Sequence, residues 1–168
     1  MIENTGTLSG IFAPVVTPFR NDEVLFEDLR RNLQLFDTTS LTGYLALGSN
    51  GEARSLSAKE QLQVLKVFAA EKGNKIVMVG ITCESTRETV ERSHIAADLG
   101  FDYVCVLAPH YFSRRMTGAV IKSFYERVAD ASALPVILYN APGFASGVSI
   151  PAGIASELAS HPNISGIK

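Results

Sequence analysis

The sequence predicts an α/β fold, the first part of a (β/α)8 or TIM barrel, from three observations. Short apolar runs rich in Val, Ile, Leu and Tyr alternate with longer segments that carry helix signals. The runs begin at a near-regular interval, close to the roughly 30 residues that one β/α unit of such a barrel occupies. They are almost continuously apolar, as expected for parallel strands with helices on one face and a barrel interior on the other. The expected strands are GIFAPVVTPF, GYLALGSNG, KIVMVGITCES, YVCVLAPHYF, PVILYNAP and ISGIK, which begin at Gly10, Gly43, Lys75, Tyr103, Pro135 and Ile164.

The segments between these runs carry the start and stop signals of helices. Ser57 and Glu60 have the spacing of a capping box, and their segment closes on Gly73. The segment from Ser85 to Gly100 repeats this design with Glu88. The apolar face of the first of these helices is expected at Leu62, Leu65 and Ala69. Further helices are expected over 26–36, 117–131 and 151–160, the last of them stopped by the proline at 162.

Five β/α units and the start of a sixth strand do not close a barrel of eight. An open parallel sheet would leave an apolar edge exposed to pairing with other chains. We therefore expect residues 1–168 to be the N-terminal part of a single TIM-barrel domain, with the remainder of the barrel beyond Lys168.

Composition and charge narrow the class of protein. With 15 basic and 17 acidic residues and a net charge of −2, neither a nucleic acid nor an anionic membrane is expected as a partner. No apolar run reaches the roughly 20 residues that span a bilayer, and MIENTGTLSG lacks the features of a signal peptide, so a cytoplasmic location is expected. Cys83 and Cys105 have no ligand spacing and are expected to be buried free thiols. His94, His110 and His161 are scattered without metal spacing.

The catalytic candidates follow the apolar runs, because the active site of a parallel barrel lies at the carboxyl ends of its strands. Polar stretches stand there: GSNGE at 48–52, PHYFSRR at 109–115, YNAP at 139–142 and finally Lys168. A lysine inside a crowded barrel would have a lowered pKa, and its neutral amine could attack a ketone to form an imine. The alternative reading of Lys168 is a solvated surface group.

Two of the three stretches before Lys168 also permit two interpretations. GSNGE is a glycine-rich turn that could simply connect a strand to a helix, or could hold a carboxylate with its free N–H groups and the Ser49 hydroxyl. It lacks the phosphate-binding pattern of nucleotide sites. Tyr139 could be an amphipathic strand-end residue or a phenol that moves protons beside an imine.

Taken together, PVVTPF, GSNGE, PHYF, YNAP and a terminal GIK, in this order, resemble the dihydrodipicolinate synthase and N-acetylneuraminate lyase superfamily of class I aldolases. The resemblance covers essentially the whole chain. It implies a (β/α)8 barrel with extra C-terminal helices, commonly assembled as a homotetramer that is a dimer of dimers. It also implies that the covalent imine with substrate is formed without a cofactor or metal.

The resemblance assigns roles to residues position by position. Lys168 would form the imine with pyruvate or another 2-oxo acid, and Tyr139 would transfer protons. Gly48, Ser49 and Asn50 would bind the carboxylate of the 2-oxo acid, and Ser49 and Asn50 would also relay protons. Phe144 would be a further substrate-binding residue. Ser49 keeps a hydroxyl where the synthase has the first threonine of a Thr-Thr pair, whereas Asn50 does not. Tyr111 matches a tyrosine that is donated across a tight dimer interface to complete the proton relay.

One departure from the synthase pattern bears on the substrate. The synthase reads YNVPSRTG, with an arginine for the carboxylate of its second substrate, but this chain reads YNAPGFASG with Phe144 near that place. A phenyl ring cannot offer a bidentate fork to a carboxylate, so synthase activity is doubtful unless Arg114 or Arg115 reaches in.

GSNGEA, CESTRETVE, RRMT and SHPNISGIK are more similar to the 4-hydroxy-2-oxoglutarate aldolase branch, whose products are pyruvate and the aldehyde glyoxylate. The alternatives are the synthase, a 2-keto-3-deoxy sugar-acid aldolase or N-acetylneuraminate lyase, and a barrel that binds 2-oxo acids without turnover.

Overall fold

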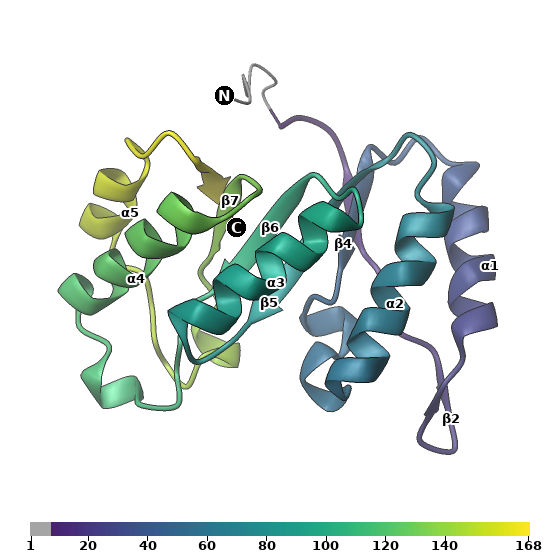
Figure 1. The fold of residues 1–168 in the computed structure, drawn as a ribbon, viewed down its shortest axis with the longest axis horizontal. Coiled ribbons are helices and arrows are strands. Elements are labelled where there is room, and N and C mark those ends of the chain that lie inside the picture. Colours follow the sequence, from purple (N-terminus) through teal and green to yellow (C-terminus); the bar gives the residue numbers. More distant parts are fainter. Residues whose placement is uncertain (1–7) are drawn as a thin grey trace.

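Six parallel strands form one sheet in chain order, with helices along one face (Figure 1). Each strand pairs with the next along the chain, as successive strands do in a (β/α)8 barrel. The computed structural model describes residues 8–168. Residues 1–7 lie outside the described residues; they belong to the expected domain and to the N-terminal stretch in which no signal peptide was expected. The strands of the sheet are β1 (Phe12–Pro14), β4 (Gly43–Ala46), β5 (Ile76–Thr82), β6 (Tyr103–Leu107), β7 (Val136–Tyr139) and β8 (Ile164–Ile167).

The predicted succession of strands and helices is confirmed. The helices are α1 (Phe26–Asp37), α2 (Ala58–Glu71), α3 (Thr86–Asp98), α4 (Gly118–Ala131) and α5 (Ala152–Leu158). Four short 3-10 turns lie in the loops after β4, β6 and β7: η1 (Ser49–Gly51) and η2 (Ala53–Ser55), then η3 (Ser113–Arg115), then η4 (Pro142–Phe144). Helix α5 ends two residues earlier than expected, well before the proline at 162.

A small hairpin between the first strand and α1 was not predicted. Strands β2 (Phe19–Arg20) and β3 (Glu23–Val24) pair antiparallel through Asn21 and Asp22, whose φ angles are 50° and 64°. Two successive residues with positive φ are the signature of a tight hairpin turn, and Asn and Asp tolerate that conformation better than most residues. The Asn-Asp pair in the sequence was the available signal.

The two predicted capping boxes differ in the structure. At the start of α2 the box is complete, because Ser57 Oγ accepts from Glu60 N while Glu60 Oε2 accepts from Ser57 N at 2.8 Å. At the start of α3, Ser85 accepts from Glu88 N, but the Glu88 carboxylate pairs with Arg92 at 2.9 Å one turn later. The second box is therefore half formed, and an ion pair within the helix takes the place of its other half.

The buried face of α2 also differs from the prediction. Leu65 is buried as expected and Ala69 half-buried, but Leu62 is exposed. The helix instead buries Val64, Leu65, Val67 and Phe68. The buried arc is wide because α2 packs on α1 and, through Phe68, also on Tyr44 of β4, so a single i, i+3, i+7 stripe does not describe it.

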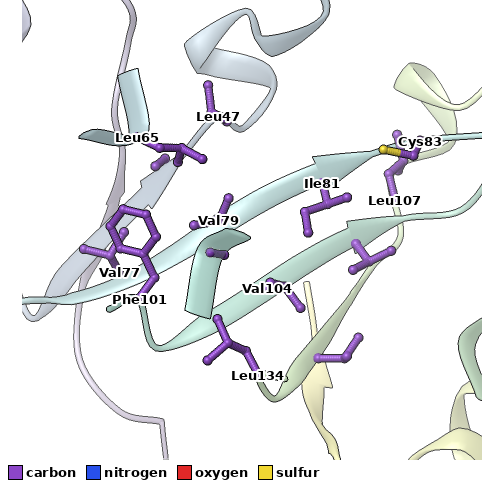
Figure 2. Packing of buried hydrophobic residues seen from close by; sticks show 14 of the residues in the cluster. Leu47, Leu65, Val77, Val79, Ile81, Cys83, Phe101, Val104, Leu107 and Leu134 are labelled. Carbon is purple, nitrogen blue, oxygen red and sulfur yellow. The ribbon is translucent and has the colours of Figure 1, made fainter. Parts of the chain in front are cut away.

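The sheet is covered by apolar side chains on both faces. Between the strands and the helices lies the larger cluster, which includes Val79, Ile81 and Val104 (Figure 2). A smaller cluster on the opposite face consists of Leu45, Met78, Tyr103, Cys105 and Ile137. This second face corresponds to a barrel interior, and the two clusters explain why the strands read as continuous apolar runs.

Both cysteines are buried free thiols, as predicted. No helix within residues 8–168 is long and apolar enough to cross a membrane. In the same range, no group of three or more His, Cys, Asp or Glu side chains is placed to hold a metal ion.

Candidate active site

A cavity of about 220 Å³ opens at the carboxyl ends of strands β4 to β7. Its lining includes Gly48, Ser49, Tyr139 and Phe144, four of the residues that the sequence marked as candidates. The hydrophobic floor comes from side chains of the interior face such as Leu45. The polar ends of several strands therefore converge on one small cavity, which is where a parallel barrel carries its chemistry.

The GSNGE turn owes its shape to residues in unusual backbone conformations. Leu47, buried at the end of β4, has a φ of 53°, and Glu52 at the end of the turn has a φ of 51°. Non-glycine residues in this region are uncommon and cost free energy, and they gather at functional sites. Gly80 on the next strand accommodates the bend, because a Cβ there would lie 2.4 Å from the Leu47 carbonyl oxygen.

Thr17, from the PVVTPF motif that follows β1, contacts the GSNGE turn and holds it in place. Its buried hydroxyl donates a hydrogen bond of 2.7 Å to the carbonyl oxygen of Gly51. Val15 on the same segment donates from its backbone N–H to Leu45 O at 3.1 Å. The first motif thus positions Ser49 without lining the cavity itself, a role that the sequence did not indicate.

Ser49, Tyr139 and Lys168 lie together. The Ser49 Oγ and Tyr139 Oη atoms are 3.2 Å apart, within hydrogen-bonding distance. The Lys168 Nζ atom lies 4.1 Å from the centroid of the Tyr139 ring. Burial raises the pKa of the Cys105 thiol to about 12, and the Lys168 charge acts in the opposite direction. An amine, a phenol and a hydroxyl in sequence form a path along which protons can move.

A bulge in β8 decides which side chain faces Tyr139. Val136 pairs with Ile164, but the next residue, Ile137, pairs with Gly166, so the register shifts by one residue of β8. Beyond the bulge, Lys168 N donates to Leu138 O at 2.8 Å and Lys168 O accepts from Asn140 N at 2.9 Å. These two bonds flank Tyr139 and place Lys168 opposite it. A regular ladder would put Ile167 there, because a shift by one residue moves each side chain to the other face.

The surroundings of Lys168 differ from the expectation of a crowded interior. Lys168 is exposed, and β8 is an outer strand of the six-stranded sheet. Among residues 8–168, therefore, no shell of side chains desolvates the amine.

Four of the residues named from the sequence lie away from the cavity. Asn50 is exposed on η1 and does not line it. Tyr111 is 77% exposed and packs edge to face on Phe112, with ring centroids 4.9 Å apart. Arg114 and Arg115 share the hollow beside Tyr111 and do not reach the cavity of their own chain.

The loop that carries Tyr111 is held by an acidic side chain. Glu84 Oε2 accepts hydrogen bonds from the backbone N–H groups of His110 and Tyr111, both at 2.9 Å. The His110 ring lies 3.4 Å from the same carboxylate, and His161 contacts Asp130 at 3.1 Å. These two histidines have structural partners.

Arg54 and Glu52 also line the cavity, and the sequence reasoning overlooked both. Arg54 Nη1 donates to the carbonyl oxygen of Thr82 at 3.2 Å, which ties the β4–α2 loop to the end of β5. The available signal was two charged residues directly after a glycine-rich turn at the functional end of the sheet.

Comparisons with known proteins place this geometry in a family. The chain is 40% identical over 164 residues to a 4-hydroxy-tetrahydrodipicolinate synthase of Stenotrophomonas maltophilia, covering 96% of this chain and 54% of the relative. It is 34% identical over 163 residues to a Coccidioides immitis protein named "Putative 4-hydroxy-2-oxoglutarate aldolase, mitochondrial", covering 95% of this chain and 52% of that relative. The chain thus spans about half the length of the curated relatives it matches.

A solved structure supports the same grouping. The dihydrodipicolinate synthase from Acinetobacter baumannii, crystallised in complex with pyruvate, superposes with a TM-score of 0.87 at 33% sequence identity. The match covers 95% of this chain and 54% of that one. The dihydrodipicolinate synthetase family matches residues 7–168. The order of the motifs, the parallel strands of the barrel and this match agree, and the chain belongs to the dihydrodipicolinate synthetase family.

Proposed function

We propose that the protein is a class I aldolase that makes or cleaves a C–C bond next to a pyruvate-type 2-oxo acid through an imine on Lys168. One observation carries the proposal: the Lys168 amine lies 4.1 Å from the Tyr139 ring, and the Tyr139 hydroxyl lies 3.2 Å from that of Ser49. An amine nucleophile beside a two-hydroxyl relay has the parts that imine formation needs. One relative named as an aldolase and another named as a synthase support the class of reaction.

The proposed cleavage assigns a role to each of these groups. The neutral Lys168 amine attacks the C2 carbonyl, Tyr139 protonates the resulting oxygen, and loss of water from the carbinolamine leaves the imine. Deprotonation of the 4-hydroxyl then breaks the bond between C3 and C4, which releases an aldehyde and moves the electron pair into the imine as an enamine. Protonation of C3 and hydrolysis release pyruvate. Ser49 relays the protons between Tyr139 and the substrate.

The favoured substrate class is 4-hydroxy-2-oxoglutarate, which yields pyruvate and glyoxylate. Phe144, 64% exposed at the cavity, supplies no charge for the second substrate of the synthase reaction. The synthase itself is the second candidate, because the 40% identical relative carries that name. A sugar-acid aldolase or N-acetylneuraminate lyase, and a barrel that binds 2-oxo acids without turnover, are the remaining alternatives.

Borohydride trapping tests the chemistry directly. We expect incubation of the full-length protein with pyruvate and borohydride to add a reduced pyruvyl group, mapped by peptide mass spectrometry to Lys168. Lys168→Ala should abolish trapping and turnover, and Tyr139→Phe should slow turnover by about 100-fold or more, the usual contribution of a proton-transfer group. A Lys168→Ala variant with normal activity would refute the imine mechanism. Trapping without cleavage of any 4-hydroxy-2-oxo acid would favour the non-enzymatic barrel, and pyruvate condensation with aspartate semialdehyde would favour the synthase.

The assembly of the protein is a separate proposal. We propose a homotetramer, built as a dimer of dimers, in which Tyr111 of one copy reaches the site of another. Pyruvate and an aldehyde would be its small-molecule partners, and neither a cofactor nor a metal is required for imine chemistry. A cytoplasmic location stays a prediction, since one relative carries a mitochondrial name.

A further inference from the structure

We propose that Arg54 binds the distal carboxylate of the substrate and thereby selects 4-hydroxy-2-oxo acids whose aldehyde fragment carries a carboxylate. The inference rests on the proposed function, because it needs a substrate held at Lys168. It adds the residue that would distinguish glyoxylate from an uncharged aldehyde.

Arg54 lies in the wall of the same cavity as Ser49 and Tyr139. It belongs to the β4–α2 loop, on η2, while Tyr139 ends β7 and Lys168 follows β8. Lys168 is not part of this lining but lies against Tyr139, which is. A substrate bonded to Lys168 through C2 would therefore enter the cavity beside Tyr139 and extend toward Arg54. Among residues 8–168, Arg54 supplies the guanidinium of this lining.

Arg54 is exposed, and the hydrogen bond of 3.2 Å from its Nη1 to Thr82 O orients the guanidinium toward the end of β5. Within the described residues, the Thr82 carbonyl oxygen is the hydrogen-bond acceptor for the Arg54 guanidinium. The Nη2 atom is therefore available to a ligand. A guanidinium that is already oriented loses less conformational entropy on binding than a freely rotating one. Bidentate pairing with a carboxylate is the contact for which this group is best suited.

Opposite charges in the lining mean that a substrate carboxylate is bound by direct contact with Arg54 and not by long-range electrostatic attraction. Glu52 lines the same cavity and opposes the positive potential of Arg54. An anionic substrate therefore gains little from Arg54 at long range and must form hydrogen bonds with the guanidinium itself. Shape and charge both matter in that contact, so lysine should replace Arg54 only in part.

The size of the cavity agrees with a small diacid. The part of it that residues 8–168 line has a volume of about 220 Å³, below the roughly 300 Å³ of common ligand pockets. Phe144 stands at the place where a second cation would otherwise be expected, and Arg114 and Arg115 lie in another hollow. This leaves Arg54 as the residue of the described cavity that can recognise a second carboxylate.

Two matched substrates provide the test. The full-length protein and its Arg54→Met and Arg54→Lys variants would cleave 4-hydroxy-2-oxoglutarate and 4-hydroxy-2-oxopentanoate, which differ in a carboxylate against a methyl group. We expect Arg54→Met to lower kcat/KM for the diacid about 10- to 100-fold while changing the methyl substrate less than about threefold. Arg54→Lys should recover part of the loss. Arg87→Met, at an exposed position on α3, is the matched control and should behave as the parent.

Pyruvate trapping with borohydride separates the two hypotheses. Trapping in Arg54→Met at the parental rate, together with loss of diacid selectivity, would support the role of Arg54. Parental trapping with equal kinetic effects on both substrates, or with none, would overturn this role while leaving the imine mechanism in place. Absence of trapping in the parent protein would overturn the proposed function and this inference with it.

Discussion

At the scale of single residues, two fully buried tyrosines show how differently one side chain can be satisfied. Tyr125 Oη donates a hydrogen bond of 2.9 Å to Val106 O, whereas the Tyr44 hydroxyl has no partner among the described residues. Tyr44 packs between Phe36 and Phe68, with ring centroids 6.4 and 6.3 Å away. Burial, and secondarily the charge of Asp37, raises the pKa of its phenol. Burial of its hydroxyl therefore costs desolvation free energy that no hydrogen bond within the described residues offsets.

Removing the two hydroxyl groups should accordingly have opposite effects. We expect Tyr44→Phe to raise the free energy of unfolding by up to about 1 kcal/mol, because it removes an unsatisfied polar atom. Tyr125→Phe should lower it by about 1 to 2 kcal/mol, since the Val106 carbonyl would lose its buried donor. Urea denaturation of both variants and the parent would measure these changes. Equal destabilisation by the two substitutions would mean that a bound water satisfies Tyr44.

At the scale of elements, contacts from neighbouring strands and loops position the loop after β4. Thr17 holds it at Gly51, the absence of a side chain at Gly80 allows its bend, and Arg54 ties it to Thr82. Two residues with positive φ, Leu47 and Glu52, mark where the backbone is strained. Such strain persists only when several contacts oppose it, so each contact contributes to the position of the Ser49 hydroxyl.

Substitution of Thr17 should loosen this loop. We expect Thr17→Val, which keeps the volume but removes the hydroxyl, to lower stability by about 1 to 2 kcal/mol and to lower kcat more than it changes trapping of pyruvate. Thr17→Ser keeps the bond to Gly51 O and is the matched control. Thermal unfolding and steady-state kinetics would report the two effects. Normal kinetics in Thr17→Val would show that Ser49 does not depend on this clamp.

At the scale of the whole molecule, Tyr111 is separated from the cavity that it is proposed to complete. Its side chain is 77% exposed, and Glu84 fixes its backbone in an outward loop. In a symmetric dimer the same loop of a second copy can meet the cavity, because the contact is repeated in both directions. The proposed assembly therefore has a direct functional test.

Mixing two inactive variants should restore activity. Tyr111→Phe lacks the donated hydroxyl and Lys168→Ala lacks the nucleophile, so a mixed dimer holds one site with both groups. After denaturation and joint refolding at equal amounts, we expect about a quarter of the parental activity, from half of the dimers having one working site. No recovery in the mixture, despite mixed dimers by native mass spectrometry, would place Tyr111 outside the partner's site.

The sequence by itself determined the alternation of strands and helices, the burial of both cysteines and the gathering of Gly48, Ser49, Tyr139 and Phe144 at one end of the sheet. These follow from local signals, since apolar runs, caps and glycines act over a few residues. Only the tertiary structure decided the register of the strands and the contacts between segments that are distant in the chain. The bulge in β8 that turns Lys168 toward Tyr139, the clamp from Thr17 and the approach of Arg54 to Thr82 each join segments distant in the chain. No local pattern encodes such contacts, because their geometry is set by how whole elements pack against one another.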